Sequence, residues 1–149
     1  MKKYLQKKLN NEKGMTLIEL LAVIVIIAII AAIAIPAIGN IIENSRYGAV
    51  KSDFQNALAA ANLYVAEEGT DPTDLASLSE YIEDTGSLTD VTISRVTTAA
   101  GSTAGADEGS LEILGSFDLN GTAESLTVAQ TNAELSEMSA AEFKELIQE

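Results

Sequence analysis

KGMTLIELLAVIVIIAIIAAIAIPAI, residues 13–38, is the stretch that decides the fold. No polar residue falls between Leu20 and Ile35, and one carboxylate, Glu19, stands just before this run. A helix needs about 20 apolar residues to cross the hydrocarbon core of a bilayer, so we expect Leu20 to Ile38 to be transmembrane. A charge inside hydrocarbon is costly unless it finds a partner. The acid at this position is therefore the feature that a plain membrane anchor leaves unexplained.

The helical pattern continues past the apolar run. Apolar residues recur at spacings of three and four, which is one face of a helix, and Gly69 supplies a stop. We expect a continuous helix from Thr16 to Glu68, apolar over residues 15–42 and amphipathic over residues 43–68. Pro36, followed by Gly39, predicts a kink, because proline removes a backbone donor and clashes with the preceding turn. The stripe that we expect to pack against the rest of the protein is Val50, Phe54, Leu58, Ala61 and Val65.

Residues 69–149 have the composition of a small globular head that begins with a short helix. Asp71 as a cap and Pro72 in the first turn predict the start of this helix. Its apolar face would consist of Leu75, Leu78, Tyr81 and Ile82. At the far end of the head, Ser139 to Glu142 form a capping box that predicts a terminal helix. The apolar side of that helix would consist of Phe143, Leu146 and Ile147.

Between these two helices the head has the pattern of an antiparallel sheet. Strand-forming runs occupy residues 91–97, 111–119 and 125–129. Asn120-Gly121 between alternating runs is a strong hairpin signal. Residues 98–109 are small and polar and predict a loop. The expected fold class is α+β, a long N-terminal helix followed by a head with a sheet and two short helices.

Composition and charge narrow the function classes. The chain of 149 residues has no cysteine and no histidine, so thiol chemistry and the usual proton-transfer group at neutral pH are missing. We expect no enzyme, no cofactor and no metal site. Residues 1–14 carry five lysines and one glutamate, so the net charge of −13 leaves −17 for residues 15–149. An acidic body repels phosphates, and a basic segment before an apolar run stays in the cytoplasm. We therefore expect no nucleic-acid binding, and we expect the head on the side of the membrane opposite the cytoplasm.

Two ordinary interpretations compete at the N-terminal segment. Ala32-Ile33-Ala34 is similar to the small-residue cleavage site of a secretory signal peptide. The chain could also be a single-pass anchor for a binding domain that never polymerises. Neither interpretation gives Glu19 a reason.

The segment from Lys13 to Glu19 resembles the N-terminus of the type IV pilin, or prepilin, family. Gly14 and the Thr16-Leu17-Ile18-Glu19 run match the family motif, and Pro36 falls where many members carry a proline. Met15 replaces the usual phenylalanine. The resemblance implies that residues 1–14 are a class III signal peptide, which a prepilin peptidase cuts between Gly14 and Met15 before it N-methylates Met15.

Cleavage would change the electrostatics of Glu19. It would create an α-amino group on Met15, which is largely cationic at neutral pH because its unperturbed pKa is about 8. This amine lies one helical turn before Glu19, so an internal pair is possible. The resemblance implies instead that Glu19 meets the Met15 amine of a neighbouring subunit. We treat this pair as a register check, because a misplaced subunit would leave two charges unpaired.

The resemblance also implies a function and a set of partners. The chain would be a single-pass precursor in the plasma membrane, in contact with lipid, that later self-associates into a helical extracellular pilus for adhesion, motility or surface interaction. An inner-membrane platform protein and an assembly ATPase would drive this step. A pseudopilin of a type II secretion or competence (DNA uptake) apparatus is the alternative. The lack of cysteines and of a calcium-loop pattern favours the pilus.

Overall fold

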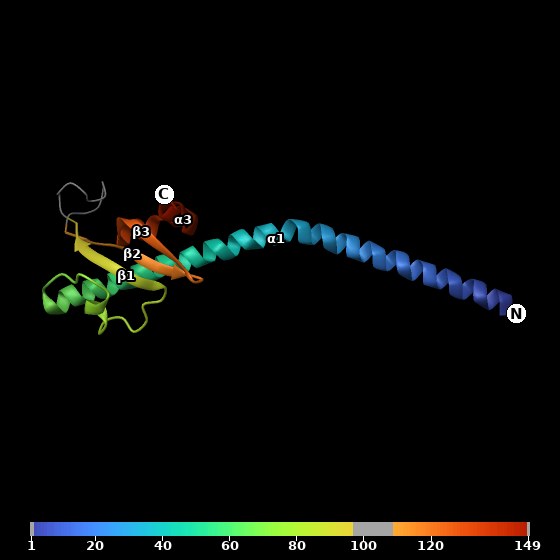
Figure 1. The fold of residues 1–149 in the computed structure, drawn as a ribbon, viewed down its shortest axis with the longest axis horizontal. Helices are drawn as coiled ribbons and strands as arrows, with labels where there is room; N and C mark the ends of the chain where they lie inside the picture. The colour runs from blue at the N-terminus through green and yellow to red at the C-terminus, as the bar shows by residue number, and fades with distance from the viewer. Residues whose placement is uncertain (1, 97–108, 149) are drawn as a thin grey trace. The chain divides into compact units, whose positions relative to one another are not determined.

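The computed structural model describes residues 2–96 and 109–148, and the side chains of residues 17–96 and 109–147. The chain divides into two compact units, residues 1–42 and 43–149. The described residues of the first unit are all helical, and the second unit contains the head (Figure 1). The predicted loop over residues 98–109 lies outside the described residues except for Gly109.

The long helix, α1, spans Lys2–Glu68. The helix continues through Pro36 without a break, and the kink that we predicted at Pro36 and Gly39 stays a prediction. Gly69 ends the helix with a positive φ of 68°, and its N–H donates to the carbonyl of Val65 at 3.0 Å. Glycine suits this position because it takes up the left-handed conformation at little cost.

The sheet has three antiparallel strands in chain order: β1 (Leu88–Arg95), β2 (Leu111–Leu119) and β3 (Thr122–Thr131). The predicted Asn120-Gly121 hairpin joins β2 to β3, with φ values of 60° and 81°. Two positive φ angles in succession are what a two-residue hairpin turn of type I′ requires. The Gly121 N–H donates to Asp118 Oδ1 at 2.6 Å and holds the turn. The α+β class and the antiparallel sheet are thus confirmed.

The core of the second unit lies between α1 and the sheet. Phe54 on α1 is fully buried, and its ring meets Phe117 of β2 and Phe143 of the terminal helix edge-on. Aromatic rings favour this edge-to-face arrangement because the positive ring edge faces the negative ring face. Of the expected stripe, Val50, Phe54, Leu58 and Ala61 are buried, and Val65 packs against the core at partial exposure.

The prediction of a helix that begins at Asp71 is wrong. Only one 3₁₀ turn forms, η1 (Ala76–Leu78). Thr73 and Asp74 instead pair with β1, through the Ile93 N–H to the Thr73 carbonyl at 3.2 Å and an antiparallel bridge between Asp74 and Thr92. This pairing uses backbone groups of Thr73 and Asp74 that a first helical turn would have needed. The apolar side chains keep their place all the same, with Leu78 buried and Leu75, Tyr81 and Ile82 packed partly against the core.

Two short helices close the head. The predicted terminal helix is α3 (Ala140–Gln148), and its capping box forms as expected. The Ser139 N–H donates to Glu142 Oε2 at 2.7 Å, and the Glu142 N–H donates to Ser139 Oγ at 3.2 Å. Sequence reasoning missed α2 (Asn132–Glu137), which begins at a second capping box made by Thr131 and Glu134. The signal was present as Thr131-Asn132-Ala133-Glu134 directly after a strand.

Candidate assembly surface and processing site

The first unit presents an apolar surface to its surroundings. Every large apolar side chain from Leu17 to Ile42 is exposed, from 47 % at Ile42 to 71 % at Ile33. The segment belongs to a helix whose most apolar 18-residue window has a mean hydropathy of 3.2 and no buried residue. It is the one helix in the described part of the chain that is long and apolar enough to cross a membrane. A surface of this kind marks a lipid or protein contact.

The predicted processing site lies within the same helix. Gly14 and Met15 are in α1, and their side chains are outside those that the structure describes. Glu19 is exposed, and no described residue donates a hydrogen bond to its carboxylate. Met15 lies four residues earlier, which in a helix is the neighbouring position on one face. The pairing of Glu19 with the Met15 amine remains a prediction.

The residues predicted to form the transmembrane segment and the kink are also accessible. Leu20 to Ile38 are exposed or half-buried along the whole segment. Pro36 and Gly39 are both exposed, and a side chain added at Gly39 would meet nothing within 4 Å. Within this unit, no described residue covers these side chains.

In the second unit, polar contacts fix the head to α1. Asp53 Oδ2 accepts hydrogen bonds from the N–H and the hydroxyl of Ser87, at 2.8 and 2.7 Å. Lys51 Nζ donates to the carbonyl of Met138 at 2.7 Å. The Tyr47 hydroxyl donates to Glu124 Oε2 at 2.9 Å. The amphipathic part of α1 is thus part of the head's own structure.

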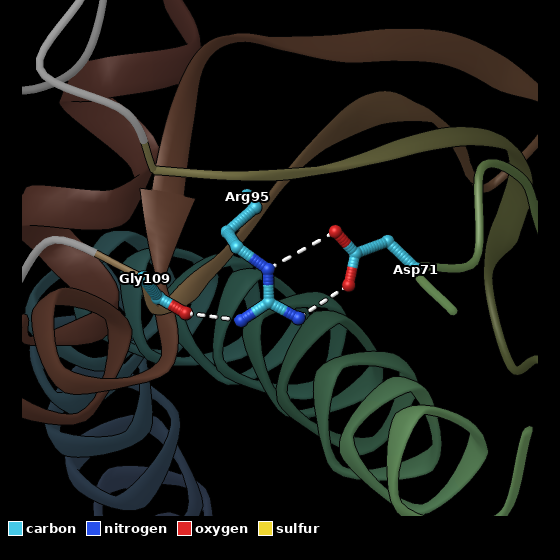
Figure 2. A network of polar contacts seen from close by, with 3 residues as sticks. All are labelled: Asp71, Arg95 and Gly109. Carbon is cyan, nitrogen blue, oxygen red and sulfur yellow. Dashed lines mark hydrogen bonds and ion pairs between the residues drawn. The ribbon is translucent and has the colours of Figure 1, made fainter. Parts of the chain in front are cut away.

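An ion pair joins two distant parts of the head (Figure 2). Arg95, the last residue of β1, pairs with Asp71 through two donors and also donates to the carbonyl of Gly109. The guanidinium holds the pKa of Asp71 below its ordinary value, chiefly through the hydrogen bond. Two backbone hydrogen bonds lie at the same end of β1. The Gly109 N–H donates to the Val96 carbonyl at 3.0 Å, and the Val96 N–H donates to the Ser110 carbonyl at 2.8 Å. Sequence reasoning had no signal for this contact, because 24 residues separate the two charges.

The comparisons with known proteins agree with the geometry of the N-terminal unit. Residues 9–35 match the model of the prokaryotic N-terminal methylation motif, a range that includes Gly14, Met15 and Glu19. No curated protein and no solved structure matches the chain. Over residues 9–35, the chain carries the N-terminal methylation motif that is the class III signal peptide of type IV pilins and pseudopilins.

Proposed function

We propose that this chain is a structural subunit of a type IV pilus filament, released for assembly by cleavage between Gly14 and Met15 and by N-methylation of Met15. The observation that carries the proposal is the overlap of two features. The methylation motif covers residues 9–35, and the same helix exposes its apolar side chains as far as Ile42. A subunit that contributes to a polymer core needs both features: a signal for processing, and an apolar surface that neighbouring subunits can bury.

The apolar half of α1 would serve two environments in turn. In the membrane, lipid covers it, and no hydrophobic drive favours contact between helices. In water outside the cell, burial against identical helices would contribute about 25 cal/mol per Å² of apolar surface removed. Moving the helix from the membrane into the filament therefore requires an input of energy. Under this proposal a platform protein and an assembly ATPase supply it, and the head ends outside the cell.

Glu19 would set the register of the subunits. Its carboxylate has no partner among the described residues, and the Met15 amine that cleavage creates is the complementary charge. Removal of one partner of a buried pair typically costs about 3–5 kcal/mol. A subunit at the wrong height would leave both charges uncompensated.

A pseudopilin of a secretion or competence apparatus is the second candidate, because it would use the same N-terminal features. Length and abundance of the filament separate the two. The experiment is electron microscopy of sheared surface filaments from cells with and without the gene, with antibody labelling of the head. The proposal expects long labelled filaments that disappear on deletion. Labelled material confined to the envelope, with unchanged surface filaments, would favour the pseudopilin.

A further inference from the structure

The second unit contains an arginine that has no partner among the described residues. After residue 14 the chain has four cationic side chains, Arg46, Lys51, Arg95 and Lys144. Lys51 donates to Met138, Arg95 pairs with Asp71, and Lys144 pairs with Glu43 at 3.0 Å. Arg46 is exposed on α1, and no described residue bonds to it. In a body with a net charge of −17, an unpaired guanidinium is available for an acidic surface elsewhere.

A shallow acidic groove, widely open to solvent, lies where β3 meets α2 and α3. It has a volume of about 380 Å³. Two of its glutamates use one oxygen each in a capping box, Glu134 towards Thr131 and Glu142 towards Ser139. The third, Glu137, is exposed, and no described residue donates to it. The groove is lined by Gln130, Glu134, Glu137, Met138 and Glu142.

Gln130 gives this groove a feature beyond its charge. It is only 4 % exposed, and no hydrogen bond joins its side-chain amide to any residue that the structure describes. Glu112 Oε2 is the one buried side-chain oxygen or nitrogen without a partner in the described structure, so the Gln130 amide is accessible from the groove that this residue lines. A bound group that donates several hydrogen bonds would satisfy both the amide oxygen and the carboxylates. A guanidinium has five such donors in a planar fork.

The charges around the groove favour a cation. Three carboxylates line it, and Lys51 is the one cation bonded to a lining residue in the described structure, through the Met138 carbonyl. Hydrogen bonds from Ser139, and then the charge of Lys51, lower the pKa of Glu142 below its ordinary value. Glu142 is therefore ionised at neutral pH, and the groove keeps a net negative charge.

Arg46 and the groove lie on different sides of α1. Lys51, five residues after Arg46, points to the groove because it bonds to Met138. Five residues at about 100° each place the two side chains about 140° apart around the helix. This separation suits a heterologous contact, in which the donor of one copy meets the acceptor of the next and the contact repeats from copy to copy.

We propose that Arg46 of one copy binds in the groove lined by Gln130, Glu134, Glu137 and Glu142 of a second copy. The proposal rests on the proposed function, because it needs the chain to polymerise. It makes the contact a lateral lock between heads, separate from the apolar helix core.

Charge reversal of each side tests the contact. The full-length variants Arg46→Glu and Glu137→Arg are produced in cells that assemble the unaltered chain, and filaments are sheared and quantified. Glu137 is the better groove target, because Glu134 and Glu142 also cap helices. Each single variant is expected to lower the filament yield at least about tenfold, since like charges then face each other. The double variant is expected to restore the yield to within about twofold.

Glu80→Arg is the matched control, because it makes the same change of charge at an exposed site outside the groove. Its filament yield is expected to equal that of the unaltered chain. Wild-type yield from Arg46→Glu, or no recovery in a double variant with normal chain level and leader cleavage, would overturn the contact alone. Absence of filaments from the unaltered chain would overturn the proposed function, and this contact with it.

Crosslinking gives a second measurement that does not depend on the reversed charges. The chain has no cysteine, so Arg46→Cys with Glu137→Cys creates its only thiols. Filaments that contain this variant together with the unaltered chain are treated with a short bismaleimide. We expect covalent dimers and larger multimers, at a yield well above that of an Arg46→Cys, Glu80→Cys pair. Equal yields from the two pairs would overturn the contact.

Discussion

The Phe54 ring on α1 lies 6.0 Å from the Phe117 ring on β2, centroid to centroid, with their planes at 87°. Both side chains are fully buried. The contact joins residues far apart in the chain, and a second edge-on contact links Phe54 to Phe143 at 6.1 Å. One helical side chain therefore connects α1 with both the sheet and the terminal helix. The packing of the head therefore depends on the Phe54 side chain.

Phe54→Ala should destabilise the second unit by about 3–5 kcal/mol, because it removes a buried ring and leaves a cavity. The measurement is chemical unfolding of the full chain in detergent, followed by the near-UV circular dichroism of its tyrosines. Leu63→Ala is the control, since Leu63 is on the same helix and 56 % exposed. Similar unfolding midpoints for the two variants would contradict the role given to Phe54.

Gly115→Ala should destabilise the pairing of β1 with β2. A Cβ at Gly115 would collide with the carbonyl oxygen of Asp90 and lie 2.6 Å from Val91 Cα. Because these are backbone atoms, the strands would have to separate, at about 1–3 kcal/mol for overpacking of this kind. Hydrogen exchange of the β1 amides would report the loss.

The control for Gly115 is Gly48→Ala in α1. A Cβ there would lie 3.6 Å from the Ala140 Cβ, an ordinary van der Waals distance. Alanine is also the better helix former, by about 1 kcal/mol. Gly48→Ala should therefore leave stability unchanged or raise it. Exchange of the β1 amides that is no faster in Gly115→Ala than in Gly48→Ala would refute the steric explanation.

Asp71→Asn should lower stability near neutral pH, and the difference from the unaltered chain should vanish in acid. Arg95 lowers the folded-state pKa of Asp71, so the pair stabilises the fold above the unfolded-state pKa of about 4. That contribution is lost as the pH falls through the depressed folded-state value. The measurement is the unfolding midpoint from pH 7 downwards.

Asp90→Asn serves as the control for Asp71, since Asp90 is exposed and its carboxylate bonds to no described residue. Its difference from the unaltered chain should stay small at every pH. High salt should also narrow the Asp71→Asn difference, because the pair is partly exposed and salt screens it. A difference that stays constant from neutral to acid pH would exclude the ion pair as its cause.

Glu19→Ala should leave leader cleavage and membrane insertion intact and abolish or greatly reduce assembly. The reason is the unpaired Met15 amine that the variant would bury in an apolar bundle. Cleavage is measured by the mass of the membrane-bound chain, and assembly by the amount of sheared filament. Glu12→Ala is the control, because it removes an acid that lies in the expected leader and is absent from the mature chain. Normal filaments from Glu19→Ala would refute the register role.

The sequence predicts the fold where the decisive signals are local. The four-three spacing from Val50 to Ala61 marks the buried face of α1, the Asn120-Gly121 turn marks the hairpin, and Ser139 marks the start of α3. Each feature depends on residues a few positions apart, so a single stretch contains all of the information.

Tertiary contacts decide the parts that the sequence did not predict. Asp71 and Pro72 have the local preference of a helix start, yet pairing of Thr73 and Asp74 with β1 prevents the helix. The bonds from Ser87 to Asp53 join residues 34 positions apart, and no local pattern indicates them. Likewise, Gly14, Met15 and Glu19 are identified by their motif, while the roles that we propose for them involve a peptidase and neighbouring subunits, which no contact within this chain can reveal.

The N-terminus of the mature chain tests the central claim most directly. Intact mass and fragmentation of the protein from sheared surface material would locate its first residue and any added methyl group. Our account predicts a chain that begins at Met15 and carries one extra methyl on its α-amino group. A chain that still begins at Met1, or one cut near Ile35 as by a secretory signal peptidase, would contradict it.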